Sequence, residues 1–318
     1  MNKTEIIAML YEDLKGEHMA IVQYLLHAYA MGEMPLAFEI EAIAREEMRH
    51  FDWLSELIVE LGGKPSVERA KLLGVVENAA DNMRFDVQAE QGGIALYRQH
   101  IAAIDDQHIR LVLSRILSDE ESHLADFAKF VGEAEQMAAA SATASAEGSG
   151  AKPPVRIWEI LDEGVRHEYS VILQYLYHRY LMPDCEVGNE LEMQAINEMQ
   201  HLGWLAEKLK GAGGKPAIEH TPLALEGSPA DMLEADIAAE RAVTATYSQQ
   251  IPEIEDPALK TLVTRIRDHE IYHDKLFSTL LEKMEAEEEK AEQPSTEPCQ
   301  PSTPQPPAVG SLLGQEQR

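Results

Sequence analysis

Cysteine is almost missing from this 318-residue sequence, which contains only Cys185 and Cys299. Two cysteines at these positions cannot form a disulfide framework or a cysteine-based zinc site. The sequence also has no Cys-x-x-Cys pair. This absence excludes a rubredoxin-type iron centre.

Basic residues and long apolar runs are also scarce. The 27 Lys and Arg residues stand against 56 Asp and Glu residues, which gives a net charge of −29. Nucleic acids and anionic membranes bind basic patches, so we expect neither as a partner. No apolar run approaches the roughly 20 residues that a membrane helix needs. The opening MNKTEIIAMLYEDL does not resemble a secretory signal, and we expect a cytoplasmic protein that attracts cations.

Helical periodicity runs through most of the sequence. The expected helices span roughly 3–31, 36–61, 78–104, 106–135, 155–182, 187–212, 229–251 and 257–291. Gly62-Gly63-Lys64-Pro65 is predicted to end the second of them, and about a dozen residues then lead to the third. Such a connection is long enough to run along a four-helix bundle. The sequence therefore predicts an all-α fold of two tandem four-helix bundles.

Two sets of six potential metal ligands occur in the same order. Each set has two single glutamates and two Glu-x-x-His pairs. The sets are Glu17, Glu47, His50, Glu90, Glu120 and His123, and then Glu168, Glu198, His201, Glu240, Glu270 and His273. Corresponding members lie 150 or 151 residues apart, which indicates a duplicated domain.

The spacing of each set predicts a two-metal site inside a bundle. Residues three apart share a helix face, so Glu47 and His50 can reach one metal together, while Glu17 and Glu90 would each cap one metal. Glu47 and Glu120 would bridge the two. Carboxylates and imidazoles suit Fe, Mn or Zn, and redox chemistry favours iron or manganese. A solvated helix face explains one Glu-x-x-His pair, but not four on matching helices.

A tyrosine follows each single glutamate by seven residues, two helical turns later. These are Tyr24, Tyr97, Tyr175 and Tyr247. Each shares the face of its glutamate, so it could hydrogen-bond a ligand or donate an electron. Packing of a core aromatic is the alternative, and the sequence does not separate the two.

Two segments lie outside the expected bundles, which we place at 1–136 and 155–292. Residues 137–154 are small, polar and tipped with glycine and proline, as in an interdomain linker. Residues 293–318 are rich in proline and are expected to form a disordered tail.

Several short motifs resemble those of bacterioferritins, within the ferritin-like superfamily. They are Leu14-Lys15-Gly16-Glu17, Gln23-Tyr24, Glu47-Met48-Arg49-His50 and Asp119-Glu120-Glu121-Ser122-His123. The resemblance covers both halves. It implies a ferroxidase that uses O2 or H2O2 to oxidise Fe(II) at two di-iron centres for iron storage and detoxification, with the twelve residues above as ligands.

The resemblance also implies a haem position. Bacterioferritins bind haem between two subunits through a methionine inside the Glu-Met-x-His pair, where Met48 and Met199 stand. The two could ligate one haem b across an internal pseudo-twofold axis, as in a dimer within one chain. Adaptable packing of both methionines at a helix interface is the interpretation we prefer.

The sequence departs from bacterioferritins in its tandem fusion and in lacking their short fifth helix, which argues against their cage. The sequence leaves open whether the expected pseudo-dimer within one chain assembles into a higher homo-oligomer. The segment 308–314 resembles the C-terminal peptides that direct cargo into encapsulin shells, with Val309, Gly310, Ser311, Leu312 and Leu313 as the expected contacts. We expect an encapsulin shell as partner and compartment. A tail without function is the alternative.

Two other functions fit the same ligand set. One is a peroxide-scavenging di-iron or di-manganese enzyme of the rubrerythrin or manganese-catalase type. The other is a metal-binding scaffold without catalysis, which the retention of all twelve ligands disfavours.

Overall fold

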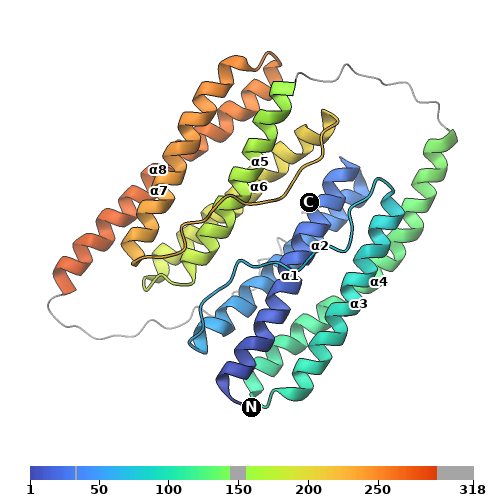
Figure 1. Ribbon diagram of the computed structural model, residues 1–318, viewed down its shortest axis with the longest axis horizontal. Coiled ribbons are helices and arrows are strands. Elements are labelled where there is room, and N and C mark those ends of the chain that lie inside the picture. Colours follow the sequence, from blue (N-terminus) through green and yellow to red (C-terminus); the bar gives the residue numbers. More distant parts are fainter. Residues whose placement is uncertain (33, 144–154, 292–318) are drawn as a thin grey trace, which may run out of the picture.

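Eight α-helices make up the part of the protein that the computed structural model describes, which is residues 1–32, 34–143 and 155–291 (Figure 1). They are α1 (Lys3–Met31), α2 (Pro35–Glu60), α3 (Ala79–Ala103), α4 (Gln107–Thr143), α5 (Val155–Arg179), α6 (Cys185–Gly211), α7 (Pro229–Gln250) and α8 (Pro257–Ala291). A 3-10 turn, η1 (Ile251–Glu253), follows α7. The predicted all-α fold of two four-helix bundles is confirmed. The predicted tail, 293–318, lies outside the described residues.

Local sequence explains where the helices begin and end. Asp256 caps α8, because its Oδ1 accepts a hydrogen bond from the Leu259 amide at 2.8 Å, as the Asp256-Pro257 pair indicates. Helix α4 continues past its predicted end at 135 into the expected linker, since the alanine-rich residues 138–143 favour a helix. The rest of that linker, 144–154, lies outside the described residues. Within the described part, no helix is both long and apolar enough to cross a membrane.

A long crossover connects the two helix pairs of each bundle and runs along its outside (Figure 1). In the first bundle, Gln23 and His27 of α1 hold it: Gln23 Oε1 accepts from the Leu73 amide at 2.8 Å, and a ring nitrogen of His27 lies 2.9 Å from the Gly74 carbonyl. Both side chains also bind buried Asp86 of α3, at 2.9 and 2.8 Å. The network therefore ties α1, α3 and the crossover together.

The second bundle repeats this network around buried Asp236. Gln174 Nε2 donates to Asp236 at 2.8 Å, and His178 Nδ1 lies 2.9 Å from the same carboxylate. The other ring nitrogen of His178 lies 2.7 Å from the Ala224 carbonyl. His27 and His178 thus tie the crossover of each bundle to its helices.

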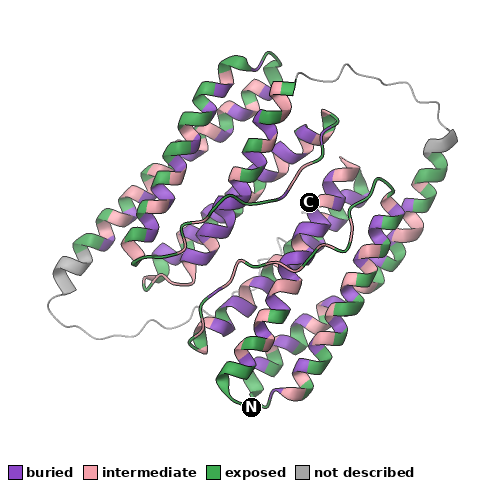
Figure 2. Ribbon diagram, in the orientation of Figure 1, coloured by how far each residue is buried: buried purple, intermediate pink, exposed green. Residues whose placement is uncertain are grey.

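The two bundles pack against each other through α1, α2, α5 and α6, with buried residues on the facing sides (Figure 2). His18 Nε2 lies 2.6 Å from Tyr169 Oη. These residues occupy equivalent positions of the repeat, 151 apart, as expected on an internal pseudo-twofold axis. Asp52 of α2 adds contacts across the interface, because it accepts from Arg179 at 2.6 Å and from Tyr180 at 2.9 Å.

Candidate metal centres

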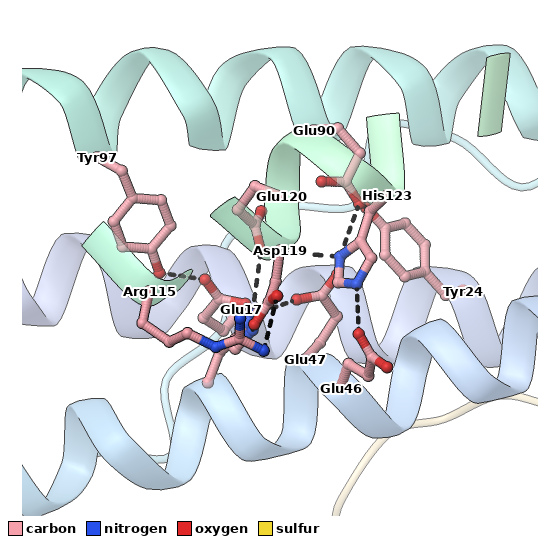
Figure 3. A network of polar contacts seen from close by, with 11 residues as sticks. Glu17, Tyr24, Glu46, Glu47, Glu90, Tyr97, Arg115, Asp119, Glu120 and His123 are labelled. Carbon is pink, nitrogen blue, oxygen red and sulfur yellow. Dashed lines mark hydrogen bonds and ion pairs between the residues drawn. The ribbon is translucent and has the colours of Figure 1, made fainter. Parts of the chain in front are cut away.

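The first cluster of ligand residues lies inside the first bundle, with contributions from all four helices (Figure 3). Its members are Glu17 of α1, Glu47 and His50 of α2, Glu90 of α3, and Glu120 and His123 of α4. All six are buried. Helical spacing turns each Glu-x-x-His pair inward together.

This cluster divides into two groups of metal-binding size. One ligand atom from each of Glu17, Glu47, His50 and Glu120 lies within 4.8 Å of the others, and the same holds for Glu47, Glu90, Glu120 and His123. Glu47 and Glu120 belong to both groups. The geometry therefore offers two neighbouring cation positions with two shared carboxylates.

The second bundle contains the same arrangement. Its groups are Glu168, Glu198, His201 and Glu270, and then Glu198, Glu240, Glu270 and His273, each within 4.8 Å and fully buried. Glu198 and Glu270 are the shared carboxylates. The structure therefore brings together all twelve residues that the sequence singles out, as two sets of six.

Several buried side-chain atoms of these clusters have no hydrogen-bond partner, as expected of atoms that coordinate a metal ion. Buried side-chain oxygens of Glu17, Glu90, Glu168 and Glu240, among others of the two clusters, have no hydrogen-bond partner. A buried polar atom without a partner is costly in a folded protein. Four carboxylates and two imidazoles offer the hard oxygen and nitrogen donors that iron, manganese and zinc accept, and two divalent ions would balance the four negative charges.

Burial and mutual repulsion shift the pKa values of the first cluster. Burial, with the charges of Glu120 and Glu47, raises the pKa of Glu17 and of Glu90 well above the ordinary value. Burial and Glu47 raise the pKa of Glu120 to about 7. Burial also acts to raise the pKa of Glu47, but hydrogen bonds from His123 and His50 outweigh it and lower that pKa.

The pKa values of the two histidines of this cluster are raised, although burial alone would lower them. Burial lowers the pKa of His123, but the hydrogen bond and charge of Glu47 raise it overall to about 9. The pKa of His50 is likewise raised against burial by the carboxylates around it. His50 Nδ1 lies 2.8 Å from Glu47 and 3.1 Å from Glu120. Protons therefore stabilise this cluster when no metal is bound.

Each of the four tyrosines binds a ligand glutamate on the neighbouring helix. Tyr24 Oη donates to Glu90 Oε1 at 2.5 Å, and Tyr97 donates to Glu17. The second bundle repeats the pattern, with Tyr175 donating to Glu240 and Tyr247 to Glu168. The sequence placed each tyrosine on the face of the glutamate seven residues before it. The hydrogen bonds instead run crosswise between helices, so each phenol orients the other single glutamate.

The contacts of three polar residues next to the ligands were not expected from the sequence, although Asp119 belongs to one of the motifs quoted above. Glu46 and Asp119 face the histidines of the first cluster, and His269 faces a histidine of the second. Each directly precedes a ligand glutamate along its helix. Charged residues are common at such positions, so the sequence carries no signal that separates them from a solvated helix face.

The first bundle also buries an Asp13–His100 pair beside its cluster. His100 Nδ1 lies 2.9 Å from Asp13. The equivalent positions in the second bundle hold Gly164 and Gln250. The two halves therefore share their ligands but differ around them.

Met48 and Met199 line one cavity between the bundles, with a volume of about 360 Å³. His18, Tyr169 and apolar residues of α1 and α5 line part of it, and α2 and α6 add further residues, among them the charged Arg45, Arg49, Asp52 and Glu192. The two methionines thus face a common space, as the internal pseudo-twofold axis requires. The expected shell-binding residues 309–313 lie outside the described residues.

Comparison with known proteins identifies the family. The ferritin family model, described as a ferritin-like domain, matches residues 7–137 and 159–286. A bacterioferritin of Streptomyces coelicolor is 32% identical over 126 residues, which cover 38% of this chain and 75% of that protein. A bacterioferritin of Desulfovibrio desulfuricans is 28% identical over 128 residues, which cover 38% and 72%.

Solved structures give similar matches. The X-ray structure of Desulfovibrio desulfuricans bacterioferritin, described as showing the diiron site in different catalytic states, is 25% identical with a TM-score of 0.42 and covers 48% of this chain and 96% of its own. Mycobacterium tuberculosis bacterioferritin is 24% identical with a TM-score of 0.39 and covers 42% and 87%. Because the family match spans both bundles and most of the sequence, the chain belongs to the ferritin-like family, with the ferritin-like domain present twice.

Proposed function

We propose that the protein is a ferroxidase that oxidises Fe(II) to Fe(III) at two di-iron centres and thereby serves iron storage and detoxification. The observation that supports this most is the pair of buried clusters, each with two cation positions that share two glutamates. The similarity to bacterioferritins also supports the proposal. Bound iron would supply the electrons that reduce O2 or H2O2, with the two ions of a centre giving one each.

The protein's own residues would hold and orient the iron. In the first centre, Glu47 and Glu120 would bridge, Glu17 with His50 would complete one position, and Glu90 with His123 the other. In the second centre, Glu198 and Glu270 would bridge, while the remaining ligands are Glu168, His201, Glu240 and His273. The excess of acidic residues, net charge −29, would draw Fe(II) towards the protein.

The tyrosines would hold the single glutamates in place. Tyr24 and Tyr97 each donate a hydrogen bond to one oxygen of a terminal glutamate and leave its second oxygen for the metal. Tyr175 and Tyr247 do the same in the second bundle. Electron donation by these phenols remains part of the proposal.

Removing one bridging carboxylate at a time tests the function. Glu47→Gln should disable the first centre, Glu198→Gln the second, and the double variant both, because an amide binds metal poorly but keeps the size of the side chain. Fe(II) oxidation in air, followed by ferric absorbance, should fall in each single variant and reach the buffer rate in the double variant. Glu39→Gln, on the exposed face of α2, is the matched control and should oxidise Fe(II) like the wild type.

Two outcomes would contradict the proposal. Oxidation no faster than in buffer for the wild type would favour the non-catalytic scaffold. Rapid H2O2 turnover without added Fe(II), together with slow Fe(II) oxidation, would indicate the peroxide-scavenging enzyme of the rubrerythrin or manganese-catalase type.

We also propose that the protein is cargo of an encapsulin shell in the cytoplasm, a proposal that depends on the sequence of 308–314 alone. The shell would store the oxidised iron. Co-expression with the shell protein, with and without residues 305–318, tests it. Equal co-purification of the two forms would contradict it.

Haem b binding by Met48 and Met199 remains the second interpretation of the interface cavity. The position of both methionines on one cavity supports it, whereas simple packing needs no further group. Expression with ample haem should give a Soret band that Met48→Leu and Met199→Leu remove. A wild-type protein without that band would leave packing as the role of both methionines.

A further inference from the structure

The two centres share their ligands but differ in what their histidines touch on the outer side. In the first centre, the ring nitrogen that points away from the cluster, Nε2, faces a carboxylate in both cases. His50 Nε2 lies 3.5 Å from Asp119 Oδ2, and His123 Nε2 lies 2.9 Å from Glu46 Oε2 (Figure 3). Both histidines can therefore donate their outer N–H to an anion.

Neutral residues occupy the equivalent positions of the second centre. His269 replaces Asp119, and His201 Nε2 lies 2.8 Å from His269 Nδ1. Asn197 replaces Glu46, and its amide donates to Gln194 Oε1 of its own helix at 2.8 Å. The two centres thus have the same six ligand types, but the residues beside their histidines differ by two negative charges.

A neighbouring arginine reduces this difference in charge between the two centres without removing it. Arg115 Nη2 lies 3.0 Å from Asp119 Oδ1, but the arginine side chain is 60% exposed, so solvent screens its charge. In the second bundle, the equivalent Arg265 stacks over Trp204 at 4.6 Å instead. Asp119 is itself only 14% exposed, which keeps its charge effective on His50, whereas Glu46 is 47% exposed and acts on His123 mainly through its direct contact at 2.9 Å.

The outer partner of a ligating histidine changes how strongly the ring binds a metal. A carboxylate that accepts the outer N–H pushes electron density into the imidazole and makes the inner nitrogen a better donor. A neutral imidazole acceptor does this less. Loss of such outer partners typically costs 10–100-fold in metal affinity or activity.

We propose that the two centres differ in affinity: the first binds divalent metal more tightly and fills first. The cause is the pair of carboxylates beside its histidines, Asp119 and Glu46, which the second centre replaces by His269 and Asn197. The inference rests on the proposed metal binding of both clusters. It adds that the duplicated centres are not interchangeable. The second centre then holds its ions more loosely and passes them on more readily.

Co(II) titration of chains with a single working centre tests the order without any oxidation step. Glu198→Gln leaves the first centre and Glu47→Gln leaves the second, and visible absorption reports binding. We expect the first centre to bind Co(II) roughly 10-fold more tightly or better. Equal affinities, or tighter binding by the second centre, would overturn this inference but not the proposed metal centres. No binding by either chain would refute the proposed metal centres as well.

Exchange of the outer partners tests the cause. With only the first centre active, Asp119→Asn keeps the shape but removes the charge and should weaken Co(II) binding roughly 10-fold. Asp126→Asn is the control, because it removes the same charge from an exposed position of the same helix. With only the second centre active, His269→Asp should strengthen binding by a similar factor. An Asp119→Asn effect no larger than that of Asp126→Asn would overturn the inference.

Discussion

Loading the metal-free protein with divalent cations at pH 7 should release roughly four protons from each centre, because metal ligands must be deprotonated. In the first centre, burial and the charges of Glu120 and Glu47 raise the pKa of Glu17 and of Glu90 well above the ordinary value, which favours a proton on each carboxyl group. His50 and His123, the latter with a pKa of about 9, each hold an extra proton. Glu120, with a pKa of about 7, adds roughly half a proton.

The second centre should release a similar number of protons, but they are distributed differently among its residues. Burial raises the pKa of Glu240 to about 8, and carboxylates raise that of His273 to about 12 against burial, so both are protonated at pH 7. His201 is protonated for the same reason as His273. Glu198, with a pKa of about 7, is half protonated, and the pKa of Glu270 is also raised by burial.

Charge balance gives the physical reason for the number. Four buried carboxylates carry four negative charges, and a low-dielectric core does not tolerate them without compensation. Roughly four protons or two divalent cations neutralise them equally well, so uptake of metal is an exchange of one for the other. Apparent affinity should therefore rise steeply with pH around neutrality, because fewer protons then have to be displaced.

Calorimetric titration with Co(II) in two buffers of different ionisation enthalpy measures the release directly. The wild type should release roughly eight protons per chain when both centres fill. The Glu47→Gln and Glu198→Gln chains should each release about half of that. Release of at most one proton per centre would refute the reasoning, since it would mean that the clusters are already deprotonated without metal.

Two further predictions concern stability. Asp86→Ala removes the acceptor of buried hydrogen bonds from Gln23 and His27 and should lower the free energy of unfolding by about 2–4 kcal/mol in denaturant titrations, whereas a loss below about 1 kcal/mol would contradict the role of the network. Gly214→Ala would place a Cβ 2.8 Å from Leu209 Cγ and 3.0 Å from the Leu209 carbonyl oxygen, and it should cost about 1–3 kcal/mol. An unchanged melting temperature would show that this turn has more room than the distances indicate.

The helices and the clustering of the candidate ligand residues could be predicted from the sequence because both depend on spacing along one helix. A Glu-x-x-His pair turns inward together wherever its helix packs, so Glu47 with His50 and Glu120 with His123 needed no tertiary information. The repeat reinforced each assignment by presenting it twice. The end of α4 was predicted too early, because its residues still favour a helix beyond the predicted end at 135 and the helix continues to Thr143.

Relations between helices could not be predicted in this way. Tyr97 shares a helix face with Glu90, yet its hydroxyl binds Glu17 of α1, because the rotation and offset of packed helices decide which side chains meet. The same holds for His18 and Tyr169, which meet at the interface between bundles although 151 residues separate them.

The sequence by itself determined that the protein has two all-α halves, each with six candidate metal ligands in the same order, since helical periodicity and spacing along one helix carry that information. Only the tertiary structure decided which tyrosine orients which glutamate and which outer partner each histidine has. Asp119 and His269 illustrate the difference: both precede a ligand glutamate, but their effect on a histidine of another helix exists only once the helices pack.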